Sequence, residues 1–533
     1  MITGMSTTVQ LGLSAGAKGV AGGLVGESAR GAKGEQSSME AISVFDIFKI
    51  GVGPSSSHTM GPWRAAQRFV EYLRLAGVLE MAVRVKSELF GSLAKTGQGH
   101  GTDLAVILGL AGEDPVTCKV EGLHDRVQAI IDAGSIALGG THRAEFDRDA
   151  DLVFHFDKAL PFHANAVTFT ALLTDGRSMA QTYYSVGGGF VVQEGETPAG
   201  ARAVKLPYQT ERGDDIVRHC KNAGLTIPQM MLRNERAWRS DEQIRAQALL
   251  IWETMVRCIH RGCHVGGVLP GGLEVSRRAK GIHDRLLGGE HSASFGGAGE
   301  PSDAQLLAWA GAVRASAADF SRTLRWVSTF ALAVNEENAA FGRVVTAPTN
   351  GAAGVIPAVM MYAWCFLRLD DYRGVLECPT PRQSAIVDFM LVAGEVGSLF
   401  KKGATISAAM GGCQAEIGVS SAMAAAGLTQ ILGGSTAQVL MAAEIAMEHH
   451  LGMTCDPIAG LVQVPCIERN TMGAMKAITA ANIALDSDPS KARVSLDGVI
   501  RTMWATALDM QTKYKETAEG GLAVNVSVGI IEC

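Results

Sequence analysis

Three cysteines, Cys413, Cys455 and Cys466, lie in glycine- and proline-rich surroundings toward the end of the sequence, and a fourth, Cys533, is its last residue. Three thiolates can hold an iron–sulfur cluster and leave one iron free to bind a substrate oxygen as a Lewis acid. A thiol on a chain end can occupy or vacate that remaining position. The spacing matches no zinc pattern such as Cys-x-x-Cys, so buried, inert thiols are the alternative interpretation.

A serine-rich run, Ser55-Ser56-Ser57-His58-Thr59, leads into a predicted helix near Pro62. Hydroxyls and free backbone N–H groups at a helix N-terminus form a suitable site for a carboxylate. Simple N-capping is the alternative. Three serines, a histidine and a threonine exceed what a cap needs, so the run is a candidate binding segment.

His100 stands between Gly99 and Gly101, which permit close backbone approach to a ligand. A neutral imidazole in such a place can remove a proton from carbon at physiological pH. The alternative is a turn histidine followed by a helix that Asp103 caps. His163 is a weaker candidate, because it can equally be a satisfied, half-buried histidine.

Two glycine-containing turns are further candidates. Thr349-Asn350-Gly351 suits a loop that surrounds a ligand with backbone groups, although Asn-Gly is also an ordinary turn. Gly187, Gly188 and Gly189 form either a tight turn or a cradle for the phosphate of pyridoxal phosphate.

Composition limits the kind of protein that can carry these residues. The chain has 533 residues, 47% of them apolar and 19% charged, with a net charge of −6 and no basic stripe. We therefore expect two or more domains, a small-molecule ligand and no nucleic-acid partner. Irregularly spaced cysteines indicate reduced thiols in a cytoplasmic protein. The uncharged stretch Ile417–Ala443 is too polar and too often interrupted by glycine to span a membrane.

The pattern of apolar residues predicts four segments: a disordered tail at 1–40 (unless translation starts at Met39), an α+β domain at 41–195, a linker at 196–212 and a mostly helical domain at 213–533. The predicted strands are Met81–Val85, Leu152–Phe156, Ala166–Leu173 and Met179–Tyr184. The predicted helices are Trp63–Ala76, His124–Ala133, Asp214–Ala223, Glu242–Arg261, Ala304–Glu336, Gln383–Lys401, Ser421–Leu432, Gln438–Leu451 and Met472–Ala484.

The run SVFDIFKIGVGPSSSHT at 43–59 closely resembles the opening of bacterial iron–sulfur L-serine dehydratases. The similarity continues through GHGTD at 99–103, PTNG at 348–351 and the three cysteine segments. The resemblance covers the chain from about residue 42 onward. It implies a fused form, in which a β-type α+β domain precedes an α-type iron–sulfur catalytic domain.

The resemblance also implies roles for individual residues. Cys413, Cys455 and Cys466 would hold a [4Fe–4S] cluster, and Cys533 would bind the remaining iron until substrate displaces it. His100 would be the base and His163 a supporting group. A homodimer is the family expectation. Gln98 departs from the family pattern, since a lysine is expected there.

The reaction implied is β-elimination of water from L-serine, giving pyruvate and ammonia. The run Ser55–Thr59 and the Thr349–Gly351 loop would hold the carboxylate and amino groups of the substrate. Two alternatives stay open: a pyridoxal-phosphate lyase that uses a lysine Schiff base, and a non-catalytic protein that senses an amino acid.

Overall fold

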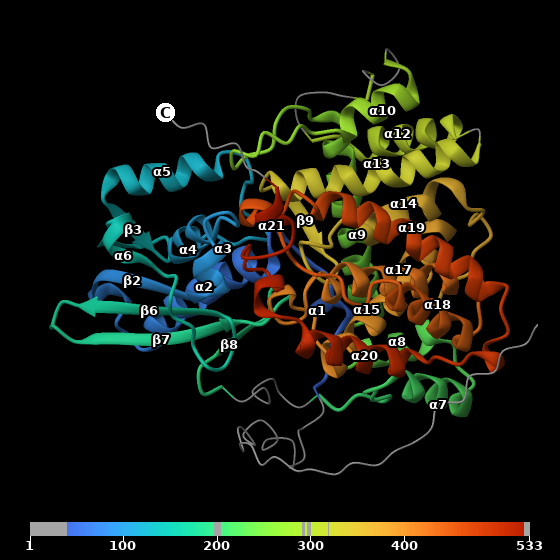
Figure 1. The fold of residues 1–533 in the computed structure, drawn as a ribbon, viewed down its shortest axis with the longest axis horizontal. Helices are drawn as coiled ribbons and strands as arrows, with labels where there is room; N and C mark the ends of the chain where they lie inside the picture. Colours follow the sequence, from blue (N-terminus) through green and yellow to red (C-terminus); the bar gives the residue numbers. More distant parts are fainter. Residues whose placement is uncertain (1–39, 197–203, 290–293, 296–299, 318, 527–533) are drawn as a thin grey trace, which may run out of the picture. The chain divides into compact units, whose positions relative to one another are not determined.

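The computed structural model describes residues 40–196, 204–289, 294–295, 300–317 and 319–526. These belong to one compact unit that begins at Met39, and Figure 1 shows their elements. The predicted tail at 1–40, apart from Glu40, and the predicted fourth cysteine ligand, Cys533, lie outside the described residues.

The N-terminal region mixes strands and helices, as predicted. Its helices are α1 Val44–Ile47, α2 Gly61–Leu75, α3 Ser92–Thr96, α4 Thr102–Leu110, α5 Leu123–Ala133 and α6 Arg148–Asp151, with helical turns η1 Ser56–Met60 and η2 Leu79–Met81. Its strands are β1 Lys49–Val52, β2 Ala82–Gly91, β3 Ser135–Leu138, β4 His142–Glu145, β5 Leu152–His155, β6 Asn165–Leu173, β7 Ser178–Ser185 and β8 Val191–Gln193.

Within the described residues, seven of these strands form one sheet with the order β3-β4-β2-β6-β7-β8, and β5 also pairs with β2. The long strand β2 is antiparallel to β6, with Leu89 opposite Val167, and parallel to β4 and β5. Helix α2 begins beside Pro62, as the sequence predicts, and packs on the sheet through Phe69, whose ring stacks 5.3 Å from that of Phe169.

The C-terminal region is mostly helical, which confirms the predicted fold class. Its helices are α7 Gly213–Ala223, α8 Ile227–Glu235, α9 Asp241–His264, α10 Ala279–Leu287, α12 Asp303–Ser316, α13 Phe320–Ala339, α14 Val355–Phe366, α15 Pro381–Gly403, α16 Ala408–Gly411, α17 Ile417–Ile431, α18 Thr436–Glu448, α19 Cys466–Leu485, α20 Leu496–Asp509 and α21 Leu522–Asn525. Short elements complete it: β9 Arg343–Thr346 and the turns η4 Cys413–Ala415, η5 Ile458–Gly460, η6 Pro489–Lys491 and η7 Thr512–Tyr514.

Helix α17 packs against α15, α18 and α19 (Figure 1). Small residues allow this close packing: a Cβ added at Gly427 would lie 2.8 Å from the ring of Phe389 on α15. The uncharged stretch 417–443 is therefore a pair of packed helices. Helix α15 is long and apolar enough to cross a membrane, but 94% of its most apolar window is buried inside the protein, as in an ordinary core helix.

The prediction of a single helix at Ala304–Glu336 is wrong. The structure has two helices there, α12 and α13, and the second begins at an N-cap. The side chain of Asp319 accepts a hydrogen bond of 2.8 Å from the backbone N–H of Arg322, which stabilises a helix start that the apolar pattern does not reveal.

Strand β1 connects the two regions, because it pairs antiparallel with β9 of the helical region, with Ile50 opposite Val345. The segment before β1 packs in the helical core, where the hydroxyl of Ser43 donates to Glu235 at 2.8 Å. The serine-rich run follows β1 in the chain, and the Thr349–Gly351 loop follows β9. This short ladder therefore positions two of the predicted site segments.

Candidate active site

The serine-rich run folds around the imidazole of His58. The hydroxyl of Ser55 accepts a 3.0 Å bond from the backbone N–H of His58, and the hydroxyl of Ser57 lies 2.9 Å from His58 Nδ1. On the other side of the ring, Nε2 lies 3.1 Å from the hydroxyl of Ser92 and 3.0 Å from that of Thr96. Both ring nitrogens are therefore held by protein hydroxyls, and the ring is fixed.

Two threonines join this run to the His100 loop. The hydroxyl of Thr59 donates to the carbonyl of His100 at 2.8 Å, and that of Thr102 donates to the carbonyl of His58 at 2.6 Å. Most hydroxyls of the run thus bind other protein groups.

His100 has the arrangement of a base. Its Nδ1 lies 2.8 Å from the carbonyl oxygen of Thr96, which can only accept, so we place the proton on Nδ1. Nε2 then carries the lone pair, is buried, and has no partner among the described residues. Burial lowers the pKa of His100 to about 4, so the imidazole is neutral at physiological pH.

Glu516 is a site residue that the sequence did not reveal. Its Oε1 lies 3.5 Å from His58 Nδ1 and 3.9 Å from His100 Nε2, and the two imidazole rings stack at 4.5 Å. Burial, together with the neighbouring Glu416 carboxylate, raises the pKa of Glu516 well above its usual range. No recognisable motif surrounds this residue, so only tertiary structure brings it here.

The three predicted cysteine ligands lie on three separate elements. Cys413 opens turn η4, Cys455 precedes η5, and Cys466 is the first residue of α19; all three are buried. The sulfurs of Cys413 and Cys455 and a carboxylate oxygen of Glu416 all lie within 4.8 Å of one another. The backbone N–H of Glu516 donates to the carbonyl of Cys455 at 2.9 Å, which joins the thiols to the histidines.

Arg469, one turn beyond Cys466 on α19, supplies positive charge beside the thiols. It donates to the carbonyl of Thr454 at 2.7 Å and to Asp456 at 2.9 Å. A hydrogen bond with Cys455, and then the Arg469 charge, lower the pKa of Cys413 to about 7 against the effect of burial. Three buried thiols beside a cation, with unpartnered buried oxygens on Thr349 and Glu516 nearby, fit a thiolate-bound metal cofactor.

The Thr349–Gly351 loop lies against the same group. A Cβ added at Gly351 would lie 2.6 Å from a carboxylate oxygen of Glu416. The amide nitrogen of Asn350 donates to the carbonyl of Val52 at 3.1 Å, which fixes the loop to the end of β1. The Asn350 amide oxygen and the Thr349 hydroxyl have no partner among the described residues.

The His100 loop packs directly on the loop between Cys455 and Cys466. A Cβ at Gly99 would lie 2.8 Å from the carbonyl oxygen of Gly460, so the glycine permits a close approach of two backbones rather than of a ligand. Beside this contact lies a hollow of about 610 Å³, which Gln98 and Gln463 help to line.

His163 and the triple glycine lie at the periphery of this arrangement. His163 is half-buried, its Nδ1 accepts a 3.1 Å bond from the N–H of Asn165, and burial lowers its pKa to about 4. Both amide atoms of the buried Asn165, which the sequence did not single out, are unpartnered within the described residues. The Gly187–Gly189 turn faces Ile406 and Pro348, so it packs against protein.

Comparisons with known proteins agree with the two-part architecture. The family model of the serine dehydratase beta chain matches residues 43–196, and that of the serine dehydratase alpha chain matches residues 222–523. The L-serine dehydratase of Streptomyces coelicolor is 49% identical over 499 residues, which cover 92% of this chain and 100% of that protein.

Two further relatives show the same extent of similarity. The L-serine dehydratase of Mycobacterium tuberculosis is 48% identical over 497 residues, covering 92% of this chain and 100% of that protein. L-serine dehydratase 2 of Escherichia coli is 44% identical over 487 residues, covering 91% of this chain and 99% of that protein. The predicted resemblance is thereby confirmed: the chain belongs to the serine dehydratase family, with the beta-chain and alpha-chain regions fused in one polypeptide.

Proposed function

We propose that this chain converts L-serine to pyruvate and ammonia by β-elimination of water, with a [4Fe–4S] cluster bound by Cys413, Cys455 and Cys466. The names of its relatives support the reaction. One observation carries the proposal: the free lone pair of His100 is buried beside Glu516, whose backbone is bonded to a cysteine of the buried thiol set.

The three thiolates would hold the cluster through three of its irons. When bound, such a cluster supplies a Lewis acid at the iron without a protein ligand, which weakens the bond between carbon and a hydroxyl group. Arg469 offsets part of the negative charge that three thiolates bring into a buried site. The reaction needs no net transfer of electrons.

His100 would accept the Cα proton of serine at Nε2. The imidazole is available because its pKa of about 4 leaves it neutral, and the bond between Nδ1 and Thr96 fixes the direction of the lone pair. Removal of that proton and loss of the hydroxyl give aminoacrylate, which tautomerises and hydrolyses in water to pyruvate and ammonia.

The remaining candidates divide into two kinds. Ser55, Ser57 and Thr59 hold the histidines, because their hydroxyls bind protein groups. Groups with unfilled hydrogen bonds would hold the substrate: the hydroxyl of Thr349 suits its carboxylate, and the amide oxygen of Asn350 suits its ammonium. The buried Ser56 stays a predicted substrate contact. His163 stays a predicted supporting group, and Gly351 would bring its loop close to Glu416.

Three expectations stay predictions: Cys533 as a replaceable ligand, a homodimer, and a cytoplasmic location.

The test of the function is anaerobic purification, quantitation of iron and sulfide, and measurement of pyruvate formed from L-serine. We expect about four irons and four sulfides per chain and iron-dependent turnover. Full activity in iron-free protein would overturn the proposal, and a borohydride-trapped Schiff base would point to pyridoxal phosphate.

A further inference from the structure

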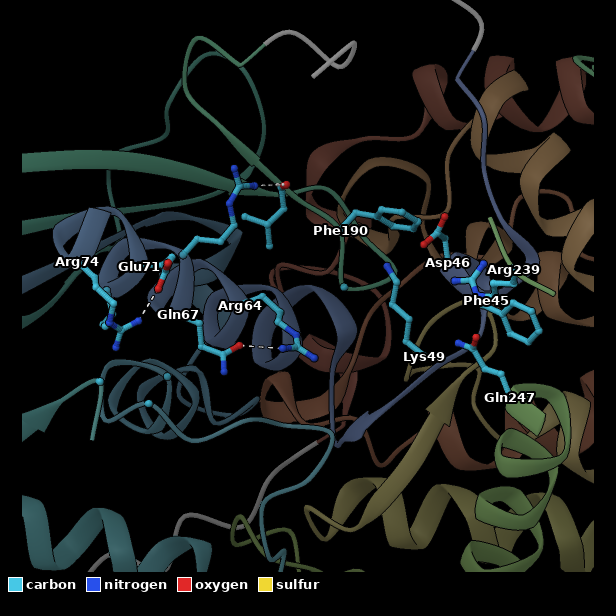
Figure 2. A pocket seen from close by; sticks show the side chains of 17 residues that line it. Phe45, Asp46, Lys49, Arg64, Gln67, Glu71, Arg74, Phe190, Arg239 and Gln247 are labelled. Carbon is cyan, nitrogen blue, oxygen red and sulfur yellow. Dashed lines mark hydrogen bonds and ion pairs between the residues drawn. The ribbon is translucent and has the colours of Figure 1, made fainter. Parts of the chain in front are cut away.

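A hollow of about 840 Å³ lies beside α2 and shares no lining residue with the candidate active site. Figure 2 shows the side chains that surround it. The lining comes from α1, β1, α2, the end of α4 and the residues after it, the turn after β3, the turn before β8 with the first residue of β8, and the chain before and within α9. Its residues are Phe45, Asp46, Lys49, Arg64, Gln67, Arg68, Val70, Glu71, Arg74, Gly109, Gly112, Gly139, Gly189, Phe190, Val191, Arg239 and Gln247.

The lining is strongly basic. It includes five cationic side chains and two carboxylates, which gives a net charge of +3 in a chain whose overall net charge is −6. Arg74 is paired with Glu71 inside the hollow. Arg64, Arg68 and Arg239 pair with Asp114, Glu196 and Glu235, which do not line it. Each arginine thus has a carboxylate partner, and Lys49 is the cation of the lining for which none is found among the described residues.

Lys49 is the cation with the least compensation. Its Nζ donates to the carbonyl of Gly188 at 3.0 Å and lies 3.2 Å from the centroid of the Phe190 ring (Figure 2). A second ammonium, that of Lys401, lies 4.6 Å from the same ring centroid. Among the described residues, no carboxylate oxygen lies within 4.0 Å of Lys49 Nζ. An ammonium has three donors, so capacity for an acceptor remains.

The surroundings of Lys49 disfavour its charge. Burial above all, with a contribution from the neighbouring cations Lys401 and Arg64, lowers its pKa to about 7. The carboxylates of Asp46 and Glu40 act in the opposite direction without cancelling the effect of burial. An anion placed in the hollow would stabilise the protonated lysine and relieve the repulsion among the three cations.

We propose that this hollow is a second ligand site, which binds a small molecule through an oxyanion group, a phosphate or a cluster of carboxylates, at Lys49 and Arg64. The volume is that of metabolite-sized sites and exceeds what a single inorganic anion fills. The amides of Gln67 and Gln247 and the ring of Phe190 offer polar and apolar contacts to the remainder of such a ligand.

The position of Lys49 links this site to the proposed catalytic centre. Lys49 opens β1 and its backbone N–H donates to the Thr346 hydroxyl of β9 at 3.0 Å, so the two strands that lead to the substrate loops meet here. Its acceptor, Gly188, packs against the carbonyl of Pro348, next to Thr349. An occupant should therefore alter serine turnover, and this coupling, unlike the binding itself, rests on the proposed function.

The experiment measures binding of inorganic phosphate and of citrate to the full chain by calorimetry. It compares the natural protein with Lys49→Gln, Arg64→Gln and a control, Lys491→Gln, whose side chain is 83% exposed in η6. We expect one site per chain, about tenfold or more weaker in the first two variants and unchanged in the control, since bonds to charged groups are strong. Preference for one probe identifies the class of oxyanion.

Sulfate provides the test of pH, because its charge is constant between about pH 8 and about pH 6. Binding favours the protonated form of Lys49, so affinity should rise as the pH falls through about 7 in the natural protein and lose this dependence in Lys49→Gln. If Lys49→Gln does not fold, Arg64→Gln decides the binding test.

If neither phosphate nor citrate binds, the proposed site is overturned. It is also overturned if Lys49→Gln and Arg64→Gln bind the anion with the same affinity as the natural protein. Binding that leaves serine turnover unchanged would overturn only the coupling. If the chain binds the anion at Lys49 but forms no pyruvate from serine, the proposed function fails while this site stands.

Discussion

The histidine side and the thiol side of the candidate active site are constructed in different ways. On the histidine side, His58 is bonded at both ring nitrogens and His100 at Nδ1, so the protein alone fixes both rings. On the thiol side, three buried cysteines come from three separate elements, the sulfurs of Cys413 and Cys455 lie within 4.8 Å of each other, and buried oxygens of Thr349 and Glu516 have no partner among the described residues.

This difference separates two roles that one active site must combine. The hydroxyl network preorganises a base before any ligand arrives, whereas the thiols and their unsatisfied neighbours need a cofactor to complete them. Changes on the thiol side should therefore remove the cofactor, and changes on the histidine side should remove rate while the cofactor stays.

The largest effect is expected for Cys413→Ala. Loss of one of three thiolates should abolish stable iron binding and, with it, all serine turnover. Iron content and the visible absorption of anaerobically purified protein measure the first effect. The matched control is Cys365→Ala, which removes a buried thiol of α14 and should leave iron unchanged. Full iron content in Cys413→Ala would remove that residue from the ligand set.

His100→Ala tests the histidine side. We expect the iron content and absorption of the natural protein, with serine turnover lower by about 10²–10⁴-fold, because the base is lost and the thiols are untouched. His449→Ala, at a side chain that is 60% exposed, is the control and should retain full activity. Loss of iron in His100→Ala would show that the two sides are not separable.

Gly99→Ala tests the contact that holds the two sides together. The added Cβ would lie 2.8 Å from the carbonyl oxygen of Gly460, and both partners are backbone, so the loops must move apart. Displacement of a base by about 1 Å can cost about 10²-fold in rate. Gly311→Ala, in an exposed helical position with open space, should leave turnover unchanged. If Gly99→Ala turns over serine as fast as the natural protein, this contact does not position the base.

The sequence predicted the architecture better than the connections within it. Long elements with a clear apolar period, such as α2 and α9, were found near their true ends because their own residues determine them. Strand β1 was not predicted, since four residues carry little pattern and its partner β9 lies far away in the chain. Helix α14 was not predicted either. It is almost wholly buried, so its sequence lacks the alternation of polar and apolar faces that indicates a helix.

Among the site residues, those with a local sequence signal were predicted and those placed only by tertiary contacts were not. His100 and Cys413 could be predicted because glycines surround them, and the structure connects the two through Glu516 and Cys455. Glu516 itself lies in an ordinary polar run, and its burial depends on contacts with residues more than fifty positions away. The serine run was predicted to bind the substrate, but in the structure most of its hydroxyls are bonded to the two histidines or to each other. The sequence around the run does not indicate these contacts.

Glu516→Gln provides the finest test, because Glu516 contacts both sides of the site. The substitution keeps the size of the side chain and removes the carboxylate that lies within 4.0 Å of a nitrogen of each imidazole. We expect kcat to fall by about 10–100-fold with little change in KM or iron content, as for groups that orient a catalytic residue. The control is Glu519→Gln, a half-exposed carboxylate paired with Lys95.

The same substitution in the His100→Ala background shows whether Glu516 acts through the base. Residues that work as a unit are strongly non-additive, so Glu516→Gln should then cost almost nothing further. A full additional loss in the double variant would assign Glu516 to the thiol side instead. In that case iron content, rather than the rate per bound iron, should fall in Glu516→Gln alone, because its backbone is bonded to Cys455.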